Sequence, residues 1–108
     1  MNISRITDTY AVAAQIDKVD VPVLAANGCT AVICNRPDDE DPGQPSAANI
    51  AAACSEHDLD FFHIPVTGLP IDTNAVSRHR QIVASSDGWV LAYCRSGHRS
   101  LVIFQAGA

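Results

Sequence analysis

The chain has 108 residues, of which 47% are hydrophobic, and it carries a formal net charge of −5. This length and apolar content predict one globular domain over residues 1–108. With only 7 lysines and arginines and no basic run, the sequence excludes nucleic acid as an expected partner. No stretch approaches the roughly 20 apolar residues of a membrane span, and no secretory segment is recognisable. We therefore expect a cytoplasmic protein without a membrane partner.

Four cysteines lie at positions 29, 34, 54 and 94. Without a secretory segment we expect them to be reduced thiols rather than disulfides. Cys54 and His57 form the one close Cys/His pair, and no second pair at zinc-ligand spacing follows it. We therefore expect neither a metal nor a cofactor.

Short β-rich runs alternate with helical patterns along the chain, which predicts an α/β domain with a largely parallel sheet. Residues 3–6 and 10–13 predict two short opening strands. Asp20 is expected to cap the first helix, with Pro22 in its first turn. Gly28 is placed to end that helix.

The middle of the chain predicts a strand, a long loop and a helix. Residues 31–34 form an apolar run typical of a buried strand. The Pro-, Gly- and acid-rich stretch 38–45 predicts a loop, in which the acidic run 38–41 is expected to be solvated. Ser46 is a good N-cap for the alanine-rich helix that should run to His57.

The last part repeats the alternation. Residues 61–66 predict a strand and its exit, and Asp72 is expected to cap the next helix. Asp87 and Gly88 should end that helix. Residues 89–93 are the strongest predicted strand, and a last helix is expected to begin at residues 99–100.

The segment from Cys94 to Arg99 joins this strand to the last helix and predicts an anion-binding loop. Backbone N–H groups at a helix start converge on an anion, and the positive end of the helix dipole adds to them. A cysteine in that field, near the Arg99 guanidinium, should have a lowered pKa and act as a thiolate nucleophile. Gly97 allows the tight turn, and Ser100 can donate its hydroxyl to the sulfur. Two neighbours, Arg95 and His98, could bind anions or be solvated. With these two alternatives left open, the predicted anion-binding loop comprises Arg95, Ser96, Gly97 and His98.

Residues 93–100, with the sequence YCRSGHRS, are very similar to the active loop of rhodanese sulfurtransferases. The whole chain resembles a bacterial family whose members look like dual-specificity phosphatases and are described as beta-lactamase hydrolase-like or sulfur transferase proteins. Besides the Cys94 loop, the stretches that carry this resemblance are 35–38 (NRPD), 41–46 (DPGQPS) and 63–68 (HIPVTG).

The resemblance implies a three-layer α/β/α sandwich of the cysteine-phosphatase type, with a mostly parallel sheet of about four to five strands. It also implies that Cys94 is the nucleophile and Arg99 the anion binder. A rhodanese-like topology is the alternative, because the two classes share a similar loop on different topologies. Some relatives are fused to a metallo-hydrolase domain that oxidises persulfides, which implies a role in sulfide metabolism beside a persulfide-oxidising partner.

The length of the loop bears on which group it transfers. Cysteine phosphatases place five residues between cysteine and arginine, whereas four separate Cys94 from Arg99. The shorter ring supplies one N–H donor fewer for the three oxygens of a phosphoryl group. A single transferred sulfur atom needs less room, so the loop length favours sulfur.

A general acid is the second distinguishing feature. Phosphoester hydrolysis needs a protonated carboxyl group near the leaving oxygen. Where dual-specificity phosphatases usually carry an aspartate, this chain has Thr67 and Gly68. Asp72 follows a few residues later and could substitute, and Asp38 or Asp41 could reach the site from the acidic loop.

We therefore expect a thiol-dependent sulfurtransferase, in which Cys94 carries sulfur from thiosulfate or a persulfide to a thiol acceptor. The alternative is a cysteine phosphatase acting on a small phosphoester. A third hypothesis is a non-catalytic or redox-sensing module in which Cys34 resolves oxidised Cys94, although Cys34 is more simply a core thiol. Arg36 and Asp72 are candidates for the rim of the cleft, with a surface salt bridge as the simpler role of Arg36.

Overall fold

Five strands form one mixed sheet in the order β1-β2-β5-β3-β4 in the computed structural model, which describes residues 1–68 and 70–107. β1 pairs antiparallel with β2, and the other three pairs are parallel. The strands are β1 (Ile3–Thr7), β2 (Tyr10–Ala13), β3 (Cys29–Cys34), β4 (Asp60–His63) and β5 (Trp89–Tyr93). The helical elements are the 3-10 turn η1 (Lys18–Asp20), α1 (Val21–Ala26), α2 (Ala47–Glu56), α3 (Thr73–Ser85) and α4 (His98–Ala106). All five predicted strands are confirmed, with ends shifted by up to three residues.

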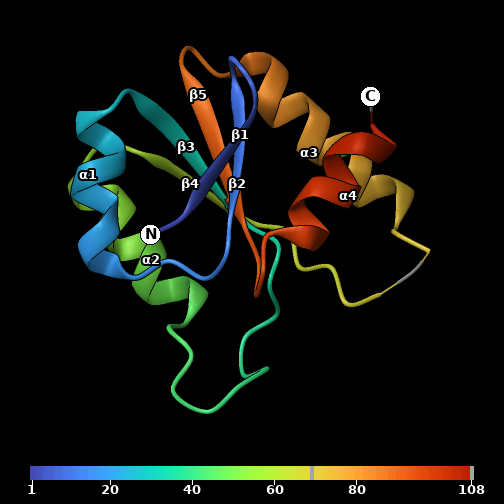
Figure 1. Ribbon diagram of the computed structural model, residues 1–108, viewed down its shortest axis with the longest axis horizontal. Helices are drawn as coiled ribbons and strands as arrows, with labels where there is room; N and C mark the ends of the chain where they lie inside the picture. The colour runs from blue at the N-terminus through green and yellow to red at the C-terminus, as the bar shows by residue number, and fades with distance from the viewer. Residues whose placement is uncertain (69, 108) are drawn as a thin grey trace.

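Helices α1 and α2 cover one face of the sheet, and α3 and α4 cover the other (Figure 1). Val32, Leu91 and Tyr93 belong to the core under α1 and α2. Their chain neighbours Ile33 and Val90 belong to the core under α3 and α4. Burial on both faces is usual for parallel strands and explains why β5 is apolar throughout and β3 is apolar except at Thr30. The predicted α/β/α sandwich is confirmed.

Two of the three predicted helix caps are confirmed. Ser46 accepts a hydrogen bond from the Asn49 N–H at 3.1 Å, and Asp72 caps α3 in a similar way. Asp20 precedes α1 as predicted, but the predicted capping hydrogen bond is wrong, because the Asp20 side chain makes none to this helix. Instead its carboxylate accepts the Asp17 N–H at 2.8 Å and closes the capping box of η1. The side chain is used by the turn that precedes the helix.

The carboxyl ends of the four parallel strands lie level at one edge of the sheet. Strand register aligns Ala13, Tyr93, Cys34 and His63 there. Cys94 follows β5 at this edge, and its N–H donates to the Ala13 carbonyl at 3.3 Å. Asn35 follows β3, and its N–H donates to the Tyr93 carbonyl at 2.8 Å. The register therefore brings Cys94 and Asn35 to the same end of the molecule.

Candidate active site

The loop after β5 turns back tightly to start α4. Gly97 precedes the helix with a φ of +93°, which L side chains rarely adopt. A Cβ at this position would lie 3.4 Å from the carbonyl carbon and oxygen of Ala13. With this geometry the Gly97 N–H donates to Cys94 Sγ at 3.1 Å. The turn therefore orients the N-terminus of α4 toward the Cys94 sulfur.

The surroundings of Cys94 favour its thiolate. Burial of the side chain opposes ionisation, because a buried charge loses solvation. The backbone N–H groups of Ser100, Ser96 and Gly97, together with the Ser100 hydroxyl, outweigh burial and lower the pKa of Cys94. Burial instead raises the pKa of each of the other three cysteines, that of Cys54 to about 11. Cys94 is thus the cysteine whose ionised, nucleophilic form the fold stabilises.

A buried polar network holds the first turn of α4 behind the loop. The Ser100 hydroxyl donates to Asn35 Oδ1 at 2.9 Å, and Asn35 Nδ2 donates to the Ile64 carbonyl at 2.9 Å. The Tyr10 hydroxyl donates to the Ser100 carbonyl at 2.7 Å. Because the Ser100 hydroxyl has one proton, it must leave Asn35 when it turns to stabilise the Cys94 thiolate. The network therefore fixes the position of Ser100, and Asn35 and the Cys94 thiolate compete for its one hydroxyl proton.

The acidic loop lies across the site and pairs with its arginine. Arg99 binds both carboxylate oxygens of Glu40, with Nη1–Oε2 and Nη2–Oε1 distances of 2.8 Å, and Nη1 also donates to the Val66 carbonyl at 2.9 Å. The hydrogen bond from Arg99 is the main reason why the pKa of Glu40 is lowered to about 2. The predicted loop is confirmed and Glu40 is exposed in it, but the carboxylates of Glu40 and Asp41 also pair with arginines that the fold brings beside them.

Arg36 is buried, with 3% of its surface exposed, and it forms the salt bridge considered from the sequence with partly exposed carboxylates of the acidic loop. Its guanidinium donates to Gln15 Oε1 at 2.9 Å, Glu40 Oε1 at 2.9 Å and Asp41 Oδ2 at 2.6 Å. Arg95 is exposed and places its Nε 3.1 Å from the same Asp41 oxygen. Arg36 thus anchors the acidic loop from a buried position.

The candidate general acids are already engaged elsewhere. Asp38 accepts the Ala47 N–H at 2.8 Å and so supports the start of α2. Asp41 lies between two guanidinium groups. Asp72 accepts the Asn74 N–H at 2.9 Å at the start of α3, and no hydrogen bond among residues 1–68 and 70–107 joins it to the Cys94 loop. The structure therefore does not bring these carboxyl groups together with the sulfur as proton donors.

The remaining site candidates keep the status of predictions. Cys34 is buried, its thiol donates to the Arg36 carbonyl at 3.3 Å, and burial raises its pKa. Both Cys34 and Cys94 are free thiols. The His98 side chain is exposed, while its N–H contacts Ser96 Oγ at 3.3 Å. Nothing in these contacts requires either role that the sequence suggested for Cys34 or His98.

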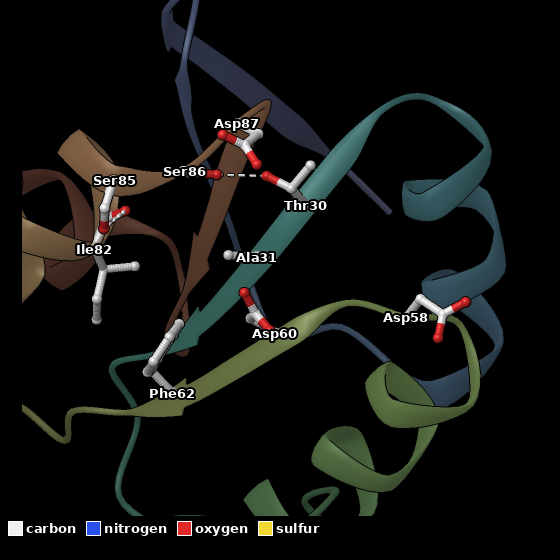
Figure 2. A pocket seen from close by; sticks show the side chains of 9 residues that line it. All are labelled: Thr30, Ala31, Asp58, Asp60, Phe62, Ile82, Ser85, Ser86 and Asp87. Carbon is white, nitrogen blue, oxygen red and sulfur yellow. Dashed lines mark hydrogen bonds between the residues drawn. The ribbon is translucent and has the colours of Figure 1, made fainter.

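Cavities lie at both edges of the sheet. One of about 290 Å³, shown in Figure 2, opens at the amino ends of β3 and β4, opposite the Cys94 edge. The carboxylates of Asp58, Asp60 and Asp87 line it, so their negative charge disfavours an anionic substrate there. Another, of about 390 Å³, lies beside the Cys94 loop and is lined by residues that include Ser96 and His98. Cys94 and Arg99 do not line this second cavity, so it borders the loop rather than the sulfur.

Residues 1–68 and 70–107 include no group of three His, Cys, Asp or Glu side chains arranged to hold a metal ion. Within the same residues, no helix has the length and apolar character needed to cross a bilayer. The expected absence of a metal and of a membrane partner stays a prediction.

The chain matches a known family over almost its whole length. The family described as "Beta-lactamase hydrolase-like protein, phosphatase-like domain" matches residues 2–108. A beta-lactamase hydrolase-like protein of Agrobacterium fabrum is 34% identical over 107 residues, which make up 99% of this chain and 25% of the relative. The chain thus spans about a quarter of the length of the curated relatives it matches.

Solved structures of phosphatase type share the fold. A candidate phosphatase from Neisseria meningitidis is 33% identical, with a TM-score of 0.83 over 93% of this chain and 71% of that one. TpbA of P. aeruginosa, solved in complex with pTyr, is 22% identical, with a TM-score of 0.68 over 94% of this chain and 59% of that one. The cysteine-phosphatase type of fold is therefore confirmed over the rhodanese-like alternative. These comparisons do not confirm sulfur transfer, and they support the phosphatase alternative better.

Three residues at the site were not predicted from the sequence. Glu40 was interpreted as part of a solvated run, because its partner Arg99 is far away in the chain. Asn35 lies in one of the stretches that carry the family resemblance, and it follows a buried strand, where polar side chains often serve a site. Tyr10 had no local signal, because its partner Ser100 is far away in the chain.

Proposed function

Because the chain belongs to the phosphatase-like domain family of the beta-lactamase hydrolase-like proteins, we propose that residues 1–108 form one catalytic domain with Cys94 as its nucleophile. The observation that carries this proposal is the 3.1 Å hydrogen bond from the Gly97 N–H to Sγ at the start of α4, where the Ser96 and Ser100 N–H groups also help to lower the pKa of Cys94. The substrate is a small anion, because the same helix start and Arg99 favour negative charge.

The reaction that this geometry supports best is sulfur transfer. The Cys94 thiolate attacks the outer sulfur of thiosulfate, the S–S bond of thiosulfate breaks, and its electron pair leaves with sulfite. Cys94 then carries a persulfide. An acceptor thiolate attacks the terminal sulfur of this persulfide, forms a new persulfide and releases the Cys94 thiolate. The cycle is balanced without an added oxidant or reductant, and a persulfide donor enters it in the same way with a thiolate as leaving group.

Two features of the site support sulfur over phosphate. The ring between Cys94 and Arg99 contains four residues, and the N–H groups of two of them, Ser96 and Gly97, already favour the negative charge of the cysteine sulfur. Sulfite and thiolates leave without being protonated, so the reaction needs no general acid. The carboxylate nearest to Arg99 is Glu40, whose pKa of about 2 keeps it ionised and unable to donate a proton at neutral pH.

Hydrolysis of a small phosphoester is the second candidate function, and the phosphatase-type relatives are the observation that favours it. In this reaction Cys94 attacks phosphorus, the phosphorus–oxygen bond to the leaving group breaks, and water later cleaves the phosphocysteine. Without a protonated carboxyl group the leaving oxygen departs as an anion. This reaction should therefore be limited to activated esters such as aryl phosphates.

A paired assay separates the two reactions. Thiocyanate formation from thiosulfate and cyanide reports sulfur transfer, and phosphate release from an aryl phosphate reports hydrolysis. Cys94→Ser should abolish whichever activity the wild-type protein shows, while Cys54→Ala, which removes a different buried thiol, should retain it. Phosphate release without thiocyanate formation would refute sulfur transfer and favour phosphoester hydrolysis. Full activity of Cys94→Ser would refute the nucleophile itself.

A further inference from the structure

Glu40 and Arg99 make a contact that the proposed chemistry does not require. A guanidinium group has five N–H donors. Two of these, on Nη1, donate to Glu40 Oε2 and the Val66 carbonyl, and one on Nη2 donates to Glu40 Oε1. Because Glu40 bridges Nη1 and Nη2, the Nε–H and the second Nη2–H remain. These two donors are parallel and lie on one edge, the geometry that binds two oxygens of an anion.

Glu40 is itself fixed from below. Arg36 Nε donates to Glu40 Oε1 at 2.9 Å, and the buried Arg36 guanidinium is tied to Gln15 and Asp41. The carboxylate therefore has a defined position between a buried arginine and Arg99, whose side chain is 23% exposed. A surface ion pair between two mobile side chains would not define the position of either.

We propose that Glu40, anchored by Arg36, is a positioning residue that holds the Arg99 guanidinium with its free edge toward an anion at Cys94. The inference rests on the proposed function in so far as both need an anion at the Cys94 loop. The contact with Glu40 is the main reason why the pKa of Arg99 is raised, and the nearby Cys94 thiolate raises it further. With Glu40 in place, Arg99 offers its remaining pair of donors without reorganising when the substrate arrives.

A purely electrostatic view predicts the opposite role for Glu40. Its negative charge neutralises Arg99 and occupies part of the guanidinium, so Glu40 would act as an internal competitor of the substrate. Removing the charge would then tighten anion binding, whereas loss of a positioning contact would weaken it. The sign of one measured change separates the two roles.

The test measures how inorganic sulfate and phosphate protect Cys94 from alkylation by iodoacetamide, followed on the Cys94 peptide by mass spectrometry. Glu40→Gln should weaken protection by each anion about fivefold, since a charge-assisted contact of a partly exposed group is lost. Asp39→Asn is the matched control, because it removes the same charge from the same loop, and among the described residues Asp39 forms no ion pair with Arg36, Arg95 or Arg99. Its protection should be unchanged or tighter. Tighter protection in Glu40→Gln would overturn the proposal in favour of the competitor role.

A double-mutant cycle shows whether Glu40 acts through Arg99. In an Arg99→Lys background, which lacks the two-donor edge, Glu40→Gln should have almost no further effect on protection. An equal effect in both backgrounds would refute the positioning role. If Glu40→Gln does not fold, Arg36→Lys serves instead, because it keeps the charge but cannot hold Gln15, Glu40 and Asp41 together. It should weaken protection, and wild-type protection would refute the anchoring role.

These outcomes are separable from failure of the proposed function. Sulfate and phosphate are unreactive probes, so their protection is measured whether or not sulfur transfer occurs. A wild-type protein whose Cys94 is alkylated no faster than the other cysteines would refute the proposed function. Rapid alkylation without protection by either anion would refute the positioning proposal alone.

Discussion

Gly97→Ala tests how the turn before α4 controls the reactivity of Cys94. An alanine at a φ of +93° costs about 1–2 kcal/mol if the backbone keeps its conformation. If the backbone relaxes to a negative φ, the Gly97 N–H turns away from Sγ and the 3.1 Å bond is lost. A hydrogen bond to a charged group contributes about 1.5–3 kcal/mol, so the thiolate becomes scarcer and alkylation at neutral pH slows roughly tenfold.

The assay is the rate of iodoacetamide reaction at Cys94, measured beside the free energy of unfolding in urea. Gly28→Ala is the matched control, because Gly28 has a φ of +88° and a Cβ there would lie 3.6 Å from Trp89 Nε1, an ordinary contact. Gly28 ends α1, at the edge of the sheet away from Cys94. Both variants should lose about 1–2 kcal/mol of stability or more, and only Gly97→Ala should react slowly. Equal alkylation rates in the two variants would refute the role assigned to this turn.

Two further predictions concern the groups behind the loop. Ser100→Ala removes a hydroxyl that helps to lower the pKa of Cys94, so the pH–rate profile of alkylation should move to higher pH; an unchanged profile would show that the backbone N–H groups suffice. Burial lowers the pKa of His79 from 6.5 to about 4, so between these pH values the unfolded chain binds a proton that the folded chain does not. The free energy of unfolding should therefore fall by up to about 3 kcal/mol as the pH drops through this range. His79→Gln should flatten this part of the stability curve, and a slope equal to that of the wild type would contradict the assignment.

Local patterns were enough to predict the strands and the reactive loop. The apolar run before Cys94, Gly97 at the turn and the helix start are contiguous, so their geometry follows from neighbouring residues. The cap at Ser46 is equally local and was predicted correctly. The cap at Asp20 was not, because residues 17–20 form a turn of their own that takes the carboxylate first.

Long-range contacts were not predictable in the same way. Glu40 and Arg99 are 59 residues apart, and the hydroxyl of Ser100 reaches Asn35 across 65 residues. Both contacts form because strand register brings the carboxyl ends of β3 and β5 level, and no pattern along the chain encodes that alignment. The acidic run was interpreted as solvated for the same reason, since its arginine partner at position 99 becomes a neighbour only in the folded sheet.

The central claim is that Cys94 accepts a sulfur atom, and intact and peptide mass spectrometry after incubation with thiosulfate tests it most directly. We predict a gain of one sulfur atom on the peptide that contains Cys94, and its loss when a thiol acceptor is added. The Cys94→Ser protein should show no gain. Thiosulfate-treated protein that gains no sulfur, or gains it on Cys34 instead, would contradict the account.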